Sequence, residues 1–216
     1  MLYRKIGNYI ENYLQSDSNK VLIVDGARQI GKSFIIRHIG QKLYKNYIEI
    51  NMEEDKLGDR IFADTRTVND FYLALSVVAG DRMKERATTL VFIDEIQAYD
   101  HLLTLLKFLK EDNRFTYIAS GSLLGVTLKN TSSIPLGSIE IKHMYPMDFE
   151  EFLLALGNDT LMGIIKKCFT ENKPMGQSMH RKAMDYFRQY LIVGGMPQAV
   201  QEYVLSKDFD KVDKIK

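Results

Sequence analysis

Residues 21–33 read Val21-Leu22-Ile23-Val24-Asp25-Gly26-Ala27-Arg28-Gln29-Ile30-Gly31-Lys32-Ser33. Four apolar, mostly β-branched residues open this run, which favours a strand that is buried on both faces of a parallel sheet. The last eight residues fit the spacing G-x-x-x-x-G-K-[S/T], and residues 34–39 after them favour a helix. A glycine loop between a buried strand and a helix predicts a phosphate-binding loop, or P-loop, whose backbone N–H groups point at the phosphates of a nucleotide.

Two side chains of this loop carry specific expectations. We expect Lys32 to reach the β- and γ-phosphates and to assist catalysis, and the Ser33 hydroxyl to ligate Mg²⁺. The loop residues predicted to contact the nucleotide are Gly26, Ala27, Arg28, Gln29, Ile30, Gly31, Lys32, Ser33 and Phe34.

The chain on either side of the loop alternates between strand and helix patterns. An amphipathic helix is expected within the first 19 residues, and another at residues 71–78. Leucines recur at three- and four-residue steps after Asp100, a plausible N-cap, and mark one buried helix face. Further strands are expected at residues 47–52, 89–93 and 115–119. This alternation predicts an α/β fold with a three-layer parallel sheet.

An acidic pair follows the strand expected at residues 89–93, in the run Leu90-Val91-Phe92-Ile93-Asp94-Glu95. Open α/β sheets bind their ligands at the carboxyl ends of the strands, where this pair would lie. Asp94 is expected to hold Mg²⁺ through its water shell, and Glu95 to be the general base for the water that attacks the γ-phosphate. Glu95 is therefore the residue that would distinguish hydrolysis from binding alone.

A polar contact is also expected after the strand at residues 115–119, where the sequence continues Ser120-Gly121-Ser122. Either serine hydroxyl could face the γ-phosphate or the attacking water. The sequence leaves the choice between Ser120 and Ser122 open.

The composition narrows the classes of partner and of compartment. With 29 basic and 28 acidic side chains the net charge is +1, so no whole-chain field favours nucleic acid or an anionic membrane. The single cysteine, Cys168, excludes an intramolecular disulfide and fits a reducing compartment, which we take to be the cytoplasm. Neither a signal peptide nor a membrane-spanning segment is expected, and the four histidines lack the spacing of a zinc site.

The pattern changes near Pro146, after which strand signals almost vanish. Asp148 and Glu151 form a variant capping box at the start of a helix, and Gly157 is expected to stop it. Three or four helices are expected in this region, at residues 148–156, about 160–171, 179–192 and 197–206. We therefore expect two domains, a P-loop core at residues 1–145 and a small all-α domain at residues 146–216.

Four further motifs accompany the P-loop. They are Ile93-Asp94-Glu95-Ile96-Gln97, Ser120-Gly121-Ser122-Leu123-Leu124-Gly125, Tyr145-Pro146-Met147-Asp148-Phe149-Glu150-Glu151-Phe152 and Tyr190-Leu191-Ile192-Val193-Gly194-Gly195-Met196-Pro197. As a set, the motifs resemble those of the prokaryotic AAA-type (AAA+) P-loop ATPases that carry a C-terminal domain similar to restriction endonucleases. The resemblance covers nearly the whole chain.

This resemblance implies ATP rather than GTP as the nucleotide, a five-stranded AAA+/RecA-like core and a helical lid after Pro146. It also implies that the C-terminal domain of the family is missing here, so the chain is expected to be a fragment. Many relatives have a basic residue where this chain has Ser138 after Gly137. Arg114, Arg181 and Arg188 remain open as alternatives for an arginine that completes the site.

Together these observations predict Mg²⁺-dependent ATP binding and slow hydrolysis, coupled to a partner or to the missing domain. Two alternatives stay open, an ATP-gated binding module with little hydrolysis and a P-loop small-molecule kinase. A GTPase is disfavoured because the chain lacks an Asn-Lys-x-Asp guanine reader. The sequence does not identify a protein or DNA partner, nor the oligomeric state.

Overall fold

The computed structural model describes residues 1–16, 18–122 and 137–216. The chain folds into two compact units, one formed by residues 6–144 and the other by residues 1–5 together with residues 145–216. Within the described residues, no helix is both long enough and apolar enough to cross a membrane.

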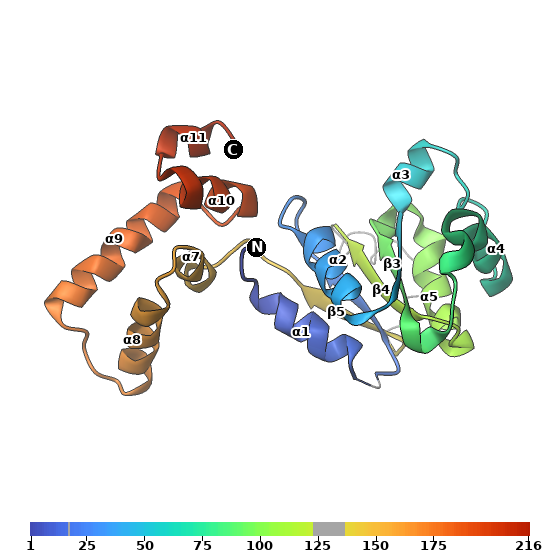
Figure 1. Ribbon diagram of the computed structural model, residues 1–216, viewed down its shortest axis with the longest axis horizontal. Coiled ribbons are helices and arrows are strands. Elements are labelled where there is room, and N and C mark those ends of the chain that lie inside the picture. Colours follow the sequence, from blue (N-terminus) through green and yellow to red (C-terminus); the bar gives the residue numbers. More distant parts are fainter. Residues whose placement is uncertain (17, 123–136) are drawn as a thin grey trace. The chain divides into compact units, whose positions relative to one another are not determined.

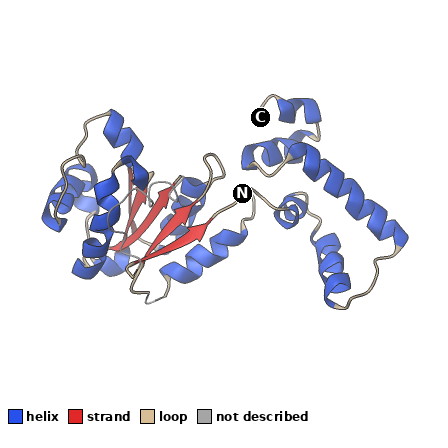
Figure 2. Cartoon of the chain, turned by 180° about the vertical axis from the view of Figure 1, so that it is seen from behind, coloured by secondary structure: helices blue, strands red, loops and turns tan. Residues whose placement is uncertain are grey.

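The first unit is built on a sheet of five parallel strands in the order β2-β3-β4-β1-β5 (Figures 1 and 2). Their bounds are β1 (Val21–Asp25), β2 (Asn46–Asn51), β3 (Thr89–Asp94), β4 (Thr116–Gly121) and β5 (Ile139–His143). The predicted α/β fold with a parallel sheet is confirmed, and so is the five-stranded core that the resemblance implied. Because all strands run the same way, their carboxyl ends share one edge of the sheet.

Helices cover both faces of this sheet. The elements are α1 (Lys5–Leu14), α2 (Lys32–Leu43), α3 (Met52–Leu57), α4 (Val68–Ala79) and α5 (Asp100–Asp112), with 3₁₀ turns η1 (Gly80–Arg82), η2 (Arg86–Thr88) and η3 (Ile96–Ala98). Helices α1 and α2 lie on one side of the sheet, and α4 and α5 on the other (Figure 1).

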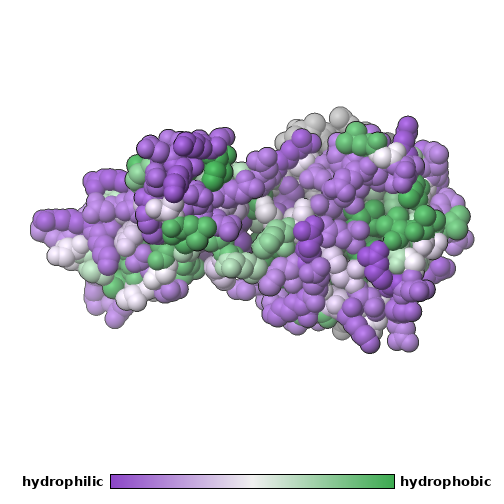
Figure 3. All heavy atoms as spheres, turned by 45° about the horizontal axis from the view of Figure 1, so that its top comes forward, coloured by the Kyte–Doolittle hydropathy of each residue, from purple (hydrophilic) through white to green (hydrophobic). Residues whose placement is uncertain are grey.

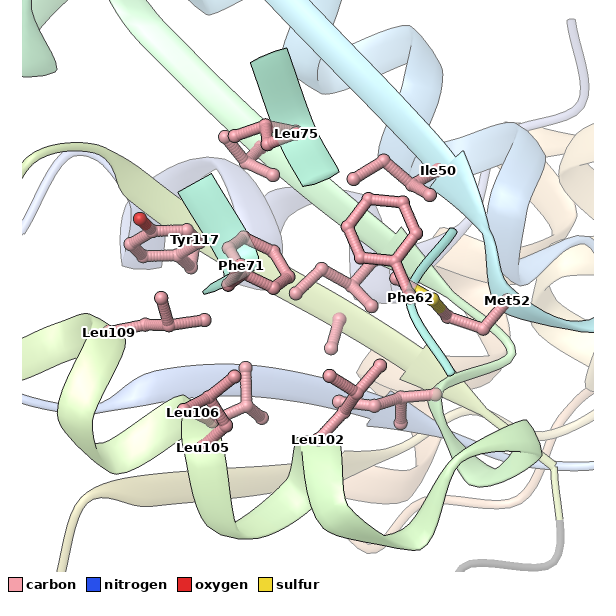
Figure 4. Packing of buried hydrophobic residues seen from close by; sticks show 14 of the residues in the cluster. Ile50, Met52, Phe62, Phe71, Leu75, Leu102, Leu105, Leu106, Leu109 and Tyr117 are labelled. Atoms are coloured by element: carbon pink, nitrogen blue, oxygen red, sulfur yellow. The ribbon is translucent and has the colours of Figure 1, made fainter. Parts of the chain in front are cut away.

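The largest core cluster of the described residues lies between the sheet and helices α4 and α5 (Figure 4). It takes alternate residues of the strands, such as Val21 and Ile23 of β1, because successive side chains of a strand point to opposite faces. The rings of Phe62 and Phe71 lie 5.5 Å apart within it. Each fully buried side chain of this size contributes about 1.5–3 kcal/mol relative to exposure.

Several element ends differ from the predictions. The strand expected at residues 115–119 is β4, Thr116–Gly121, so Ser120 lies within the strand and not after it. Met52 was expected to end a strand, but it begins α3, since the Asn51 side chain accepts hydrogen bonds from the N–H groups of Glu53 and Glu54. A side-chain N-cap of this kind starts a helix even where the apolar pattern of the strand continues. Asp100 was expected to be an N-cap, but it is the first residue of α5, and Tyr99 occupies the cap position.

Apolar side chains also reach the surface of the first unit (Figure 3). Leu73 and Val77 of α4 are exposed at 71% and 70%. Because residues four apart lie on the same face of a helix, the two form one exposed apolar strip.

The second unit is helical. Its elements are α7 (Phe149–Ala155), α8 (Asp159–Thr170), α9 (Gln177–Val193), α10 (Pro197–Ser206) and α11 (Phe209–Asp213). The first four of these correspond to the predicted helices, with ends shifted by at most two residues, and the capping box of Asp148 and Glu151 is present. Helix α11 was not predicted; the side chain of Asp208 caps it by accepting from two backbone N–H groups.

The amino-terminal segment is anchored to α7 of this unit. Arg4 donates from Nε to Glu151 Oε2 at 3.2 Å and from Nη2 to the carbonyl oxygen of Tyr145 at 2.6 Å. The N–H of Lys5 donates to Glu151 Oε1 at 2.7 Å. Both members of the Arg4–Glu151 ion pair are buried, so each depends on the other for its charge to be balanced.

Candidate functional site

The glycine loop lies between β1 and α2, and Gly26 makes its tightest backbone approach. Gly26 has a φ of 152°, and a Cβ at this position would lie 2.3 Å from the carbonyl oxygen of Met144. The N–H of Met144 in turn donates to the carbonyl oxygen of Asp25 at 2.7 Å. Only glycine fits here without displacing the backbone beyond β5.

Gly31 ends the loop and is the N-cap of α2, in the left-handed conformation with a φ of 91°. Gln29 also has a positive φ, of 63°, so the loop curls tightly before the helix starts. The N-cap makes no side-chain capping bond. The first N–H groups of α2, with the partial positive charge of the helix end, are therefore suited to an anion.

Lys32 lies across this loop. It is 5% exposed, and its Nζ donates to the carbonyl oxygens of Gly26 at 3.0 Å and Ala27 at 2.8 Å. Burial lowers the pKa of Lys32 below 10.5, and nearby carboxylates, that of Glu95 foremost, oppose the shift. The ammonium group is thus held inside the loop, close to acidic side chains.

The other predicted loop residues differ in exposure. Ala27, Arg28 and Gln29 are exposed, as is Phe34 just inside the helix. Ile30 is fully buried. Its side chain fills the space beside Gly26 and so packs against the buried side of the loop.

The acidic pair lies at the end of β3. Asp94 is 5% exposed and accepts hydrogen bonds from the Ser120 hydroxyl and, at 3.1 Å, from the N–H of Glu95. Glu95 has a φ of 50°, in the left-handed region that non-glycine residues rarely adopt. This turn directs the two neighbouring carboxylates differently, Asp94 into the sheet edge and Glu95 onto η3.

The two serines contact different carboxylates. Ser120 donates to Asp94, whereas Ser122 donates from Oγ to Glu95 Oε2 at 3.1 Å. Both are buried. The sequence could not choose between them, and the structure brings each to one member of the acidic pair. The rest of that motif, residues 123–125, lies outside the described residues.

Two polar side chains were missed at this edge. Gln97 of η3 donates to Glu95 Oε2 and contacts Ser122. His143, at the end of β5, pairs with Asp25 through Nδ1 and Oδ2 at 2.9 Å. Gln97 belongs to the motif quoted with Asp94 and Glu95, so its spacing of two residues from Glu95 was the available signal.

Other candidates lie elsewhere. Arg114 precedes β4 at the amino edge of the sheet and pairs with Asp112 at 3.1 Å. A cavity of about 470 Å³, whose lining includes Ser18, Arg86 and Lys110, also lies at the amino edge. Arg188 is on α9 of the helical unit, paired with Asp185. Neither Arg114 nor this cavity adjoins the loop, because in a parallel sheet the amino and carboxyl edges are opposite.

Comparison with solved structures shows similar folds at low sequence identity. PCH-2 of C. elegans is 12% identical with a TM-score of 0.51, over 96% of this chain and 65% of that one. The Hsp104–ADP complex of S. cerevisiae is 14% identical with a TM-score of 0.52, over 93% and 29%. AMPPCP-bound DnaA of Aquifex aeolicus is 12% identical with a TM-score of 0.51, over 96% and 62%. The chain thus spans less than two thirds of each, and the likeness concerns the fold.

The sequence itself matches one family. No match is found among the curated proteins. Residues 18–153 match the family described as "AAA domain", and this range includes the glycine loop, the acidic pair and all five strands. The chain therefore belongs to the AAA domain family, the AAA-type nucleotide-binding P-loop ATPases.

Proposed function

We propose that the chain binds ATP at residues 26–33 and hydrolyses it in an Mg²⁺-dependent reaction. The observation that carries the proposal is the convergence of a buried lysine and two acidic side chains. Lys32 lies in the loop that follows β1, and Asp94 at the end of β3 accepts from Ser120 of β4, which lies beside Val24 of β1. The carboxylates of Glu95 and Asp94 also oppose the lowering of the Lys32 pKa by burial. A cation inside a glycine loop beside a carboxylate pair is the set of groups that phosphoryl transfer to water requires.

The loop fits a polyphosphate. The backbone approach at Gly26 leaves no room for a Cβ, and the uncapped start of α2 presents N–H donors. Lys32 now donates to two loop carbonyls. We infer that it exchanges these neutral partners for β- and γ-phosphate oxygens, because hydrogen bonds between charged groups are stronger.

Ser33, as a direct ligand, and Asp94, through the water shell of the ion, are the residues proposed to hold Mg²⁺. A hydroxyl and a carboxylate are hard oxygen donors, and Mg²⁺ usually takes only one or two protein ligands beside phosphate oxygens and water. This fits the absence, among the described residues, of a cluster of three or more acidic, histidine or cysteine ligands. When bound, Mg²⁺ would neutralise charge on the β- and γ-phosphates.

Glu95 is the proposed general base, and the serines its neighbours in the site. The Glu95 carboxylate is half-buried and held by hydrogen bonds to Oε2. We infer that it orients and deprotonates a water for attack on the γ-phosphate. Ser120, through Asp94, and Ser122, through Glu95, would relay the presence of the γ-phosphate to β4.

We also propose that the nucleotide carries adenine and that its hydrolysis serves a second function of the protein. Two of the similar structures are complexes with ADP and with AMPPCP, both adenine nucleotides. We propose that hydrolysis is coupled to a partner or to a further domain through the helical unit. The reaction would take place in the cytoplasm.

Steady-state phosphate release, with nucleotide affinity measured in parallel, tests this function. Glu95→Gln should keep its affinity for ATP and lose release, whereas Lys32→Ala should lose both. Glu111→Gln, an exposed substitution on α5, is the matched control and should leave both unchanged. Binding without release in the wild type, with or without added protein or DNA, would instead indicate a nucleotide-gated binding module. Consumption of ATP without free phosphate would indicate a kinase.

A further inference from the structure

Gln97 links the ends of two strands. It lies on η3, directly after β3, and its amide Nε2 donates both to Glu95 Oε2 and, at 3.1 Å, to the Ser122 hydroxyl. Its Oε1 accepts from the backbone N–H of Ser122 at 3.1 Å. Ser122 follows β4 and closes the triangle by donating to Glu95 Oε2.

The orientation of this amide is fixed by its surroundings. A backbone N–H can only donate, so the amide oxygen of Gln97 must face Ser122 N. The amide NH₂ group then faces the Glu95 carboxylate, which can only accept when ionised. A glutamine satisfies both requirements at once, and neither a glutamate nor an apolar side chain of the same length does.

We propose that Gln97 is a positioning residue for Glu95, holding the carboxylate in the orientation for water activation and tying it to the end of β4 through Ser122. The inference rests on the proposed function, since it gives Gln97 a role only through the base. Its hydrogen bonds go to Glu95 and Ser122, and neither residue belongs to the glycine loop.

The expected consequence is a loss of turnover without a loss of binding. Glu95 is only half-buried, so without Gln97 its side chain regains rotamers that point away from the attacking water. Misplacing a catalytic group by about 1 Å lowers the rate about 10- to 100-fold. Nucleotide affinity should stay unchanged, because the loop and Lys32 keep their contacts.

Two variants distinguish the hydrogen-bonding role of the Gln97 amide from the space that its side chain fills. Gln97→Met keeps the length and removes every hydrogen bond. Gln97→Glu keeps an acceptor for Ser122 N but replaces the donor that faces Glu95 with a second carboxylate. Both should lower kcat about 10- to 100-fold at unchanged Kd for ATP. Gln41→Met, at an exposed position of α2, is the matched control and should match the wild type.

The double variant Glu95→Gln/Gln97→Met decides whether the effect passes through the base. If it does, Gln97→Met lowers kcat in the wild-type background but leaves unchanged the residual rate of Glu95→Gln, measured in single-turnover reactions with enzyme in excess over ATP. Thermal unfolding followed by circular dichroism shows whether each variant is folded. A normal kcat in a folded Gln97→Met, or a loss that persists in the Glu95→Gln background, would overturn the positioning role. Normal phosphate release in Glu95→Gln would overturn the proposed function instead.

Discussion

Replacing Gly26 with alanine tests the backbone geometry on which the glycine loop depends. A φ of 152° costs a residue with a Cβ about 1–3 kcal/mol. The added Cβ would lie 2.3 Å from the Met144 carbonyl oxygen, where ordinary contact begins near 3.4 Å. Relief requires moving Met144 and weakening its 2.7 Å hydrogen bond to Asp25, worth about 1 kcal/mol. We therefore expect Gly26→Ala to lower the free energy of unfolding by about 2–4 kcal/mol and to abolish nucleotide binding.

The measurement is urea unfolding followed by circular dichroism, with a second glycine as the control. Gly163 lies inside α8, and a Cβ there would meet nothing within 4 Å. Gly163→Ala should therefore raise helix stability by about 0.5–1 kcal/mol. A lower free energy of unfolding for Gly26→Ala and a higher one for Gly163→Ala would support the role of the Gly26 backbone, because both variants add the same methyl group. A Gly26→Ala protein as stable as the wild type, with normal nucleotide affinity, would refute it.

Three further predictions concern substitutions or titration of buried side chains, and they are tested by urea unfolding or by measuring nucleotide affinity. Phe152→Ala should destabilise the helical unit by about 3–5 kcal/mol, because Phe152 is fully buried against the rings of Tyr190 and Tyr203; a change below about 1 kcal/mol in urea unfolding would contradict this packing. Arg4→Met should cost about 3–5 kcal/mol by leaving Glu151 charged and buried, whereas the double variant Arg4→Met/Glu151→Leu should recover only part of the loss, because the N–H groups of Lys5 and Asp148 also lose their acceptor. Burial lowers the pKa of Lys32, and bound phosphates favour its charged form, so nucleotide affinity should begin to fall before pH reaches 10.5. Titrations from neutral pH to 10.5 measure this, and the fall should be absent in Lys32→Arg, whose guanidinium stays charged.

Segments with a strong local signal were predictable from the sequence. The apolar run Val21–Val24 continues into a glycine spacing that has one common structural context, so strand, loop and helix follow together. The helices of the second unit were found because capping residues and apolar stripes agree, as at Asp148 and Glu151. Where two local signals compete, prediction fails. At Asn51 the side-chain cap overrides a strand pattern that would continue through Met52.

The shortest described α-helix has too few residues to show the apolar periodicity by which helices are recognised in a sequence. Helix α11 has five residues, fewer than two turns, and its single buried residue, Val212, shows no periodicity. The anchoring of Arg4 to Glu151 joins residues 147 positions apart, and nothing local in the sequence marks such a pair. Tertiary contacts of this kind could be seen only once the fold was known.

The arrangement of the candidate site follows from strand order, which the sequence does not state. The loop follows β1 and the acidic pair follows β3, but the two strands are not neighbours, because β4 lies between them. Ser120 on β4 therefore reaches Asp94 on β3, while Ala119 and Ser120 lie beside Ile23 and Val24 of β1. The last of these three strands in the sequence thus lies between the strand that precedes the glycine loop and the strand that ends in the acidic pair. A displacement at the end of β4 would therefore shift both the glycine loop and the acidic pair. The hydrogen bonds between Gln97 and Ser122 join η3 to this end of β4, so they would pass such a displacement on to Glu95.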